Sequence, residues 1–186
     1  MSLYEEEEVK VDPSFARLIR EMGGENLYVC LQCGTCSGSC PSGRVTAYRT
    51  RMVIRSSLAG LKDKVLGEKD IWLCTTCRTC ATRCPRGIDV TKAITTIRNI
   101  AVAEGHALHP HYILSNNVIR TGCAFGDQLG EDFVDLRRSL GLPEKPVSIT
   151  FAGDGEALEK FRGVTKATGF DKLMDVKRKK EEEEKE

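Results

Sequence analysis

The sequence predicts a mainly α-helical protein built around two similar halves. Three observations support this interpretation. Apolar residues recur at helical spacing in several segments, residues that start or stop helices flank those segments, and one block of four cysteines occurs twice. A chain of 186 residues allows one domain, or one compact domain with appended segments.

The first expected helix covers residues 12–22. Asp12 suits the N-cap because its side chain can accept a hydrogen bond from a free backbone N–H. Pro13 suits the first helical position, where no N–H partner is needed. Gly23 and Gly24 then end the helix.

The next elements alternate with the cysteine blocks. A helix is expected over about residues 44–58, and residues 61–73 are expected to form a charged connection that contains the only tryptophan, Trp72. Apolar residues at helical spacing from Val90 predict a long helix that ends near Gly105. The later expectations are helices over 109–120 and 132–140, and a short amphipathic piece around Leu158 and Phe161 that docks onto the core.

The two cysteine blocks share the pattern C-x-x-C-x-x-C-x-x-x-C-P. The eight positions are Cys30, Cys33, Cys36 and Cys40 in the first block and Cys74, Cys77, Cys80 and Cys84 in the second. Three cysteines at three-residue intervals let one tight loop supply thiolates to three corners of a cubane cluster. The proline after the fourth cysteine fixes φ and removes a donor, so the chain turns away there.

In a doubled pattern of this kind, the fourth cysteine of each run ligates the other cluster. The sequence therefore predicts two [4Fe–4S] clusters with crossed ligation. The first cluster is expected to bind Cys30, Cys33, Cys36 and Cys84, and the second to bind Cys74, Cys77, Cys80 and Cys40. Zinc is the main alternative, but it gives no reason for a third cysteine at the same interval in both blocks.

Composition and charge exclude several other classes of function. Nine cysteines without a secretory signal indicate metal-binding thiols in a reducing, cytoplasmic compartment rather than a disulfide framework. No apolar run approaches the ~20 residues that span a bilayer, so no direct membrane contact is expected. A formal net charge of +1 makes no general case for nucleic acid.

No catalytic residue is predicted. The sequence contains neither a glycine-rich dinucleotide fingerprint nor a P-loop. The ninth cysteine, Cys123, is expected to be a partly buried structural thiol, with a docking loop as the alternative. Positive charge near a cluster favours its reduced form, and Arg78, Arg83 and Arg86 flank the second block. One hypothesis is therefore that the Cys74 cluster has the higher reduction potential.

The spacing between the blocks adds a family resemblance. Two such blocks separated by a helical spacer resemble the α-helical ferredoxin domain. The strings CLQCGTCSGSCP (30–41) and WLCTTCRTCATRCP (72–85) resemble the C subunit of heterodisulfide reductase from methanogenic archaea, over about residues 12–140. The resemblance implies an all-α ferredoxin-like fold with peripheral helices. The expected organisation is an acidic flexible N-terminus over 1–11, the ferredoxin domain over 12–140, a docking extension over 141–176 and a charged disordered tail over 177–186.

The same resemblance implies a role in a complex. The chain would relay electrons from a flavin-containing partner, the A subunit, to the B subunit, which reduces the CoM-S-S-CoB heterodisulfide, and a hydrogenase can supply the electrons. The B subunit of that family carries Cys-Cys-Gly motifs, and this sequence has none. Two alternatives remain open: the iron–sulfur subunit of another oxidoreductase, of glycerol-phosphate, succinate or fumarate type, and a zinc-stabilised binding module.

Overall fold

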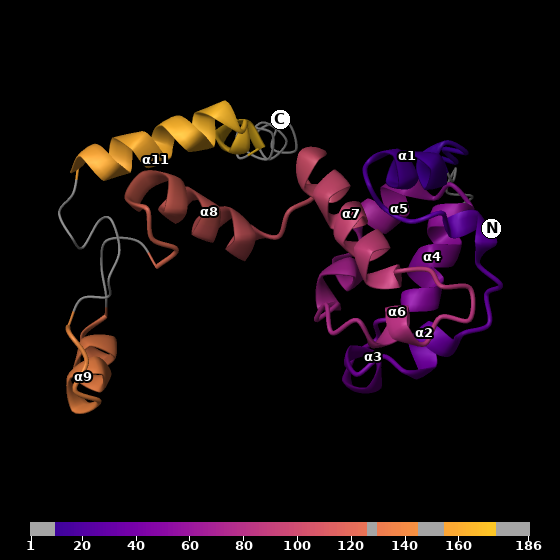
Figure 1. Ribbon diagram of the computed structural model, residues 1–186, viewed down its shortest axis with the longest axis horizontal. Coiled ribbons are helices and arrows are strands. Elements are labelled where there is room, and N and C mark those ends of the chain that lie inside the picture. The colour runs from indigo at the N-terminus through magenta and orange to yellow at the C-terminus, as the bar shows by residue number, and fades with distance from the viewer. Residues whose placement is uncertain (1–9, 126–129, 145–154, 174–186) are drawn as a thin grey trace, which may run out of the picture. The chain divides into compact units, whose positions relative to one another are not determined.

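The protein is mainly α-helical, and it divides into two compact units, Met1–His106 and Ala107–Glu186. The computed structural model describes residues 10–125, 130–144 and 155–173, and these residues contain no β-strand (Figure 1). The predicted acidic N-terminus lies almost wholly outside the described residues, and the predicted charged tail lies entirely outside them. The boundary expected near residue 140 falls within the second unit.

The first unit contains both cysteine blocks. Its elements are α1 (Phe15–Glu21), η1 (Leu27–Val29), α2 (Thr35–Gly38), α3 (Ser42–Val45), α4 (Thr50–Leu58), α5 (Lys62–Gly67), η2 (Lys69–Leu73), α6 (Thr79–Thr82) and α7 (Val90–Ala103). The short helices α2, α3 and α6 gather at one end of this unit, and α1 and α5 lie at the other end (Figure 1).

Helices α4 and α7 form the centre of the first unit. Helix α1 contacts both of them, α2 contacts α4, and α6 contacts α7. The long helix predicted from Val90 is confirmed, and Asp89 caps it by accepting a hydrogen bond from the backbone N of Lys92 at 3.0 Å. Ala93 and Ile97 on its inner face are fully buried. The two cysteine loops therefore pack against a buried apolar core.

The expectation of one continuous helix over 44–58 is wrong. The chain forms α3 and α4 instead, because Thr46 and Arg49 between them have extended backbone. The Arg49 guanidinium donates hydrogen bonds to the carbonyls of Gly43, Thr46 and Tyr48, at 2.8–2.9 Å. These bonds satisfy carbonyls that a continuous helix would have paired, and they fix the corner between the two helices.

Two other expectations about the first unit need correction. Helix α1 begins at Phe15, because the Asp12 carboxylate accepts hydrogen bonds from the backbone and hydroxyl of Ser14 and closes a turn before the helix. Residues 61–73 form α5 and η2 rather than a simple connection. The ion pair between Lys62 and Glu104, at 2.6 Å, ties α5 to the end of α7.

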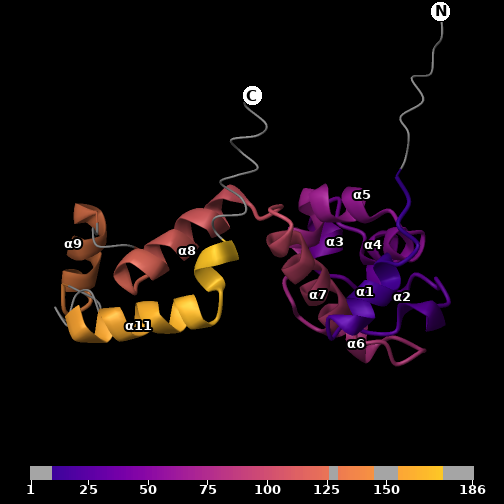
Figure 2. The ribbon, with the colours of Figure 1, turned by 90° about the horizontal axis from the view of Figure 1, so that it is seen from above.

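The second unit contains α8 (His109–Thr121), α9 (Glu131–Ser139) and α11 (Gly155–Ala167). Helix α8 is confirmed. It ends at Gly122, which has the left-handed φ of +70° that glycine adopts readily at the end of a helix. The amphipathic piece expected around Leu158 and Phe161 is part of α11, which lies beside α8 (Figures 1 and 2). Arg162 joins these helices by donating to the carbonyl of Arg120 at 2.7 Å. None of the helices described is both long and apolar enough to span a membrane.

Candidate metal centre

The two cysteine loops have the same backbone conformation. Each begins after a 3₁₀ helix, with φ and ψ of −70° and 122° at Cys30 and −69° and 122° at Cys74. The residues two positions later, Gln32 and Thr76, are left-handed, with φ of 55° and 54°. Alternation of left-handed and right-handed residues turns successive backbone N–H groups toward one point, and such concavities bind anions and iron–sulfur clusters.

The loops differ at a second left-handed position. Gly34 stands there in the first block, with φ of 82°, and Arg78 stands there in the second, with φ of 63°. A left-handed conformation costs an L-residue roughly 1–2 kcal/mol, whereas glycine adopts it freely. The second loop therefore adopts the left-handed conformation at Arg78, although glycine would adopt it at a lower cost.

The exit of each block contacts the entrance of the other. Ser42, two residues after Cys40, donates its hydroxyl hydrogen to the carbonyl of Leu73 at 2.7 Å. Arg86, two residues after Cys84, donates from Nε to the carbonyl of Val29 at 3.2 Å. Leu73 and Val29 each directly precede the first cysteine of a block. The two hydrogen bonds are thus equivalent, and they bring the fourth cysteine of each block toward the first cysteine of the other.

One pocket gathers four thiols from both blocks. It has about 430 Å³ of empty space, its open mouth included. Three apolar side chains line its inner side: Ile54 on α4, Val90 at the start of α7, and Ile88 just before α7. The cysteines that line it are Cys30, Cys33, Cys36 and Cys84. This is the set of thiols that the sequence predicts for the first cluster.

Two of the other four cysteines, Cys74 and Cys40, share a neighbour, Tyr48. Its side chain is 1% exposed, and its hydroxyl lies near the thiols of Cys74 and Cys40, which come from different blocks. Burial raises the pKa of Tyr48, and those two thiols raise it further. Cys80 lies near Cys74 in turn, and its sulfur is 3.5 Å from the hydroxyl of Thr91.

Polar groups of the loops contact the sulfurs. In the first loop, Gln32 donates from Nε2 to the sulfur of Cys30, and the hydroxyl of Thr35 lies beside the sulfur of Cys33, both at 3.4 Å. The hydrogen bond of Thr35 lowers the pKa of the Cys33 thiol. The side chain of Thr79 has the same effect on the pKa of Cys77 in the second loop. Both contacts favour the thiolate, which is the form that binds metal.

Burial acts in the opposite direction on the third cysteine of each block. It raises the pKa of Cys36 to about 11, with a smaller contribution from the neighbouring Cys30. Burial also raises the pKa of Cys80. A thiol with a raised pKa is stabilised as a thiolate by a positively charged metal centre. The arrangement therefore suits thiolates that bind metal.

The four thiols of the first set line one pocket rather than converge on one point. Within the part of the chain that the structure describes, no three Cys, His, Asp or Glu side chains lie close enough together to hold one metal ion. A zinc site would need four such ligands around one atom. All nine cysteines are free thiols, which also weighs against a disulfide framework.

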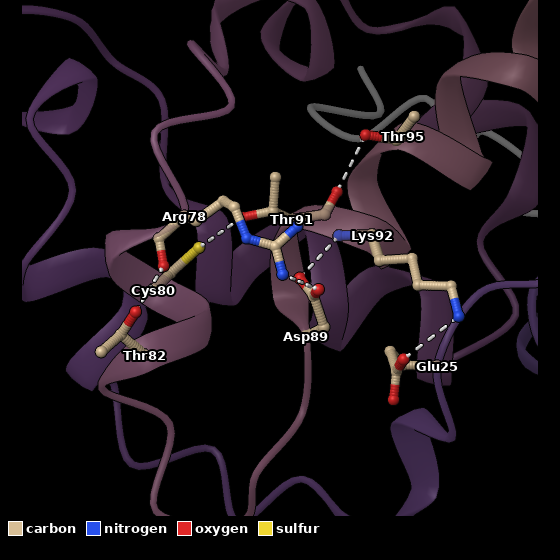
Figure 3. A network of polar contacts seen from close by, with 8 residues as sticks. All are labelled: Glu25, Arg78, Cys80, Thr82, Asp89, Thr91, Lys92 and Thr95. Carbon is tan, nitrogen blue, oxygen red and sulfur yellow. Dashed lines mark hydrogen bonds and ion pairs between the residues drawn. The ribbon is translucent and has the colours of Figure 1, made fainter.

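The arginines of the second block do not all lie beside its own thiols. Arg78 forms an ion pair with Asp89 at 2.6 Å, and Asp89 also caps α7 through Lys92 (Figure 3). This partner offsets part of the charge of Arg78. Arg86 lines the pocket of the Cys30 set, together with Arg51. The positions of these arginines therefore give no simple support to the hypothesis that the Cys74 cluster has the higher reduction potential.

Several residues at the site are not evident from the sequence. Arg51, Ile54 and Ile88 line the pocket, and Tyr48 lies at the other cysteine set. A comparison of the two halves points to two of them, because Tyr48 stands two residues before α4 and Ile88 stands two residues before α7. Cys123 is half-buried and belongs to the second unit, whereas the eight other cysteines belong to the first.

The comparisons with known proteins agree with this geometry. Residues 26–88 match the 4Fe-4S dicluster domain family, and this range contains both blocks. The fold and the site therefore define a helical iron–sulfur protein. The chain is 40% identical over 164 residues to the C subunit of the H(2):CoB-CoM heterodisulfide,ferredoxin reductase of Methanothermobacter thermautotrophicus, with 88% of this chain and 86% of that one covered.

Two further relatives give the same family name. The chain is 46% identical over 149 residues to the C2 subunit of the H(2)/formate:CoB-CoM heterodisulfide,ferredoxin reductase of Methanococcus maripaludis, with 80% and 78% covered. It is 44% identical over 173 residues to the second iron-sulfur C subunit of the CoB–CoM heterodisulfide reductase of Methanocaldococcus jannaschii, with 89% and 90% covered. The chain belongs to the family of heterodisulfide reductase C subunits, as the two cysteine strings indicate, and is a subunit of an oxidoreductase complex.

Proposed function

We propose that this chain is the electron-relay subunit of a CoB–CoM heterodisulfide reductase and holds two [4Fe–4S] clusters with crossed ligation. The observation that carries the proposal is the pair of equivalent hydrogen bonds from Ser42 to Leu73 and from Arg86 to Val29. They draw each fourth cysteine toward the opposite block. The names of the relatives supply the substrate of the complex, the CoB–CoM heterodisulfide.

The residues have separate roles in this proposal. The first cluster takes its thiolates from Cys30, Cys33, Cys36 and Cys84, and the second takes them from Cys74, Cys77, Cys80 and Cys40. Thr35 and Thr79 stabilise the outer thiolates, and Ile54 and Ile88 keep water from the inner side of the first cluster. When bound, a [4Fe–4S] cluster supplies one-electron transfer at a potential set by its surroundings.

The chemistry on the disulfide belongs to a partner in this proposal. The sequence contains no Cys-Cys-Gly motif and no flavin-binding fingerprint. The partners are therefore the flavin-containing A subunit, which delivers electrons, and the Cys-Cys-Gly-containing B subunit, which reduces the heterodisulfide. A hydrogenase is the candidate electron source in the larger complex. Eight thiols kept reduced for metal binding support a cytoplasmic location.

Anaerobic purification of the tagged chain from its own host tests the proposal. We expect stoichiometric recovery with a flavoprotein and a Cys-Cys-Gly-rich protein, and reduction of the heterodisulfide by that complex. In a complex with the Cys40→Ala and Cys84→Ala variants combined, the electron path should be broken and the reduction lost. Cys123→Ala, which changes the ninth cysteine, is the matched control and should leave the activity intact.

Two results would contradict the proposal. Recovery of the chain with a different dehydrogenase would discard the disulfide substrate. Full heterodisulfide reduction by the complex that carries both cysteine changes would show that electrons do not pass through this chain.

A further inference from the structure

The hydroxyl of Tyr48 is a buried polar group without a partner of its own in the described protein. The side chain is 1% exposed, and the oxygen makes no hydrogen bond to any described residue. Thr50 and Cys74 lie beside it, but neither meets the geometry of a hydrogen bond. A buried hydroxyl without a partner costs about 1–3 kcal/mol, so phenylalanine would suit this position better if the hydroxyl had no role.

The surroundings of the hydroxyl identify the missing acceptor. The thiols of Cys74 and Cys40, which come from different blocks, lie near it. The backbone at this position is held in place, because the backbone N of Tyr48 donates to Thr46 Oγ1 at 3.2 Å and its carbonyl accepts from Arg49 at 2.9 Å. A phenol is a good hydrogen-bond donor, and thiolates and cluster sulfides accept hydrogen bonds. The chemistry of the position therefore matches a sulfur acceptor.

The two halves of the protein provide an internal comparison. Tyr48 stands two residues before α4, and Ile88 stands two residues before α7. Ile88 lines the pocket of Cys30, Cys33, Cys36 and Cys84. One cysteine set thus faces a phenolic hydroxyl at this position, and the other set faces an aliphatic side chain that cannot donate a hydrogen bond.

We propose that Tyr48 donates a hydrogen bond to a sulfur of the cluster bound by Cys74, Cys77, Cys80 and Cys40, and that this bond raises the reduction potential of that cluster. The inference rests on the proposed ligation. The reduced cluster carries one more negative charge than the oxidised cluster, so a donated hydrogen bond stabilises the reduced form more. The phenol keeps its proton throughout, so no proton accompanies the electron. Tyr48 is a positioning residue that tunes the cluster and does not ligate it.

Tyr48→Phe tests the inference, because it removes the hydroxyl and keeps the ring. The variant is prepared anaerobically in the full chain, its iron and sulfide are counted, and both midpoint potentials are followed by electron paramagnetic resonance during a redox titration. We expect unchanged iron and sulfide, a lower midpoint for one cluster and an unchanged midpoint for the other. Tyr48→Ile, which copies the residue of the other half, should give the same shift.

The control is Tyr28→Phe, since Tyr28 is 59% exposed and lies two residues before Cys30. Both midpoints should stay unchanged in this variant. The inference is overturned if Tyr48→Phe binds both clusters and neither midpoint moves. Loss of iron from both Tyr48 variants would also overturn it, since a tuning hydroxyl is not needed to hold a cluster. Absence of [4Fe–4S] clusters from the unaltered chain would instead refute the proposed function.

Discussion

Crossed ligation can be tested by combining cysteine substitutions in pairs. If the clusters are crossed, Cys84 and Cys30 serve the same cluster, whereas Cys84 and Cys74 serve different clusters. If each block instead holds its own cluster, these relations are reversed. Alanine is the replacement of choice, because serine would leave an oxygen that can still bind iron. The structure favours crossing, since Cys84 shares one pocket with Cys30.

The expected magnitudes follow from counting ligands. Two cubane clusters give about eight iron atoms per chain, and loss of one cluster leaves about four. Cys84→Ala alone should therefore retain about four. The double variant with Cys30→Ala should also retain about four, because both changes damage one cluster, and the double variant with Cys74→Ala should fall to about zero.

The assay is iron and sulfide analysis of protein purified without oxygen, with the cluster spin signals as a second count. Cys123→Ala is the control and should retain about eight iron atoms, because Cys123 lies outside both predicted ligand sets. The reverse pattern would refute crossing: about zero iron when Cys84 and Cys30 are changed together, and about four when Cys84 and Cys74 are changed together.

Two further predictions concern stability and thiol reactivity. Gly60→Ala should lower the free energy of unfolding by about 1–3 kcal/mol, measured by thermal or denaturant unfolding, because φ is +74° and the new methyl group would stand 2.5 Å from the carbonyl oxygen of Asp12. In protein stripped of clusters, iodoacetamide near neutral pH should alkylate Cys33 and Cys77 before Cys36, as read by mass spectrometry. The thiolate is the nucleophile, so a lowered pKa increases the reactive fraction and the pKa of about 11 at Cys36 suppresses it.

Each of these predictions has an internal check. Gly67→Ala is the control for Gly60→Ala, because its added methyl group would meet no atom within 4 Å. Equal unfolding free energies for the two variants would contradict the role of the Gly60 conformation. As the pH rises toward 11, the rate at Cys36 should approach the rates at Cys33 and Cys77. Faster alkylation of Cys36 at neutral pH would show that burial does not protect it.

Much of the fold and the site could be predicted because the signals were local. The helix from Val90 to Ala103 has a capping Asp89 and apolar residues at regular helical spacing. The helix His109–Thr121 has an early proline and ends at Gly122. These features depend on residues that are neighbours along the chain, so their physical causes are visible in the sequence.

Other features were missed because their causes are distant in the sequence or lie in competing hydrogen bonds. The break between α3 and α4 depends on Arg49, whose guanidinium binds three carbonyls in place of a continuous helix. Residues 61–73 fold into helical turns that pack against α7, and Lys62 pairs with Glu104, 42 residues away. Local propensity does not reveal such partners, because tertiary contacts override it.

The sequence by itself determined the number and spacing of the thiols, and that spacing predicts iron–sulfur chemistry and indicates the family. Only the tertiary structure decided which side chains from elsewhere stand beside those thiols. It placed Arg86 of the second block at the Cys30 pocket, paired Arg78 with Asp89, and left Tyr48 and Ile88 at equivalent positions beside different cysteine sets. The physical reason is that ligand spacing is a local property of the chain, whereas the charges and donors around a sulfur come from segments that folding brings together.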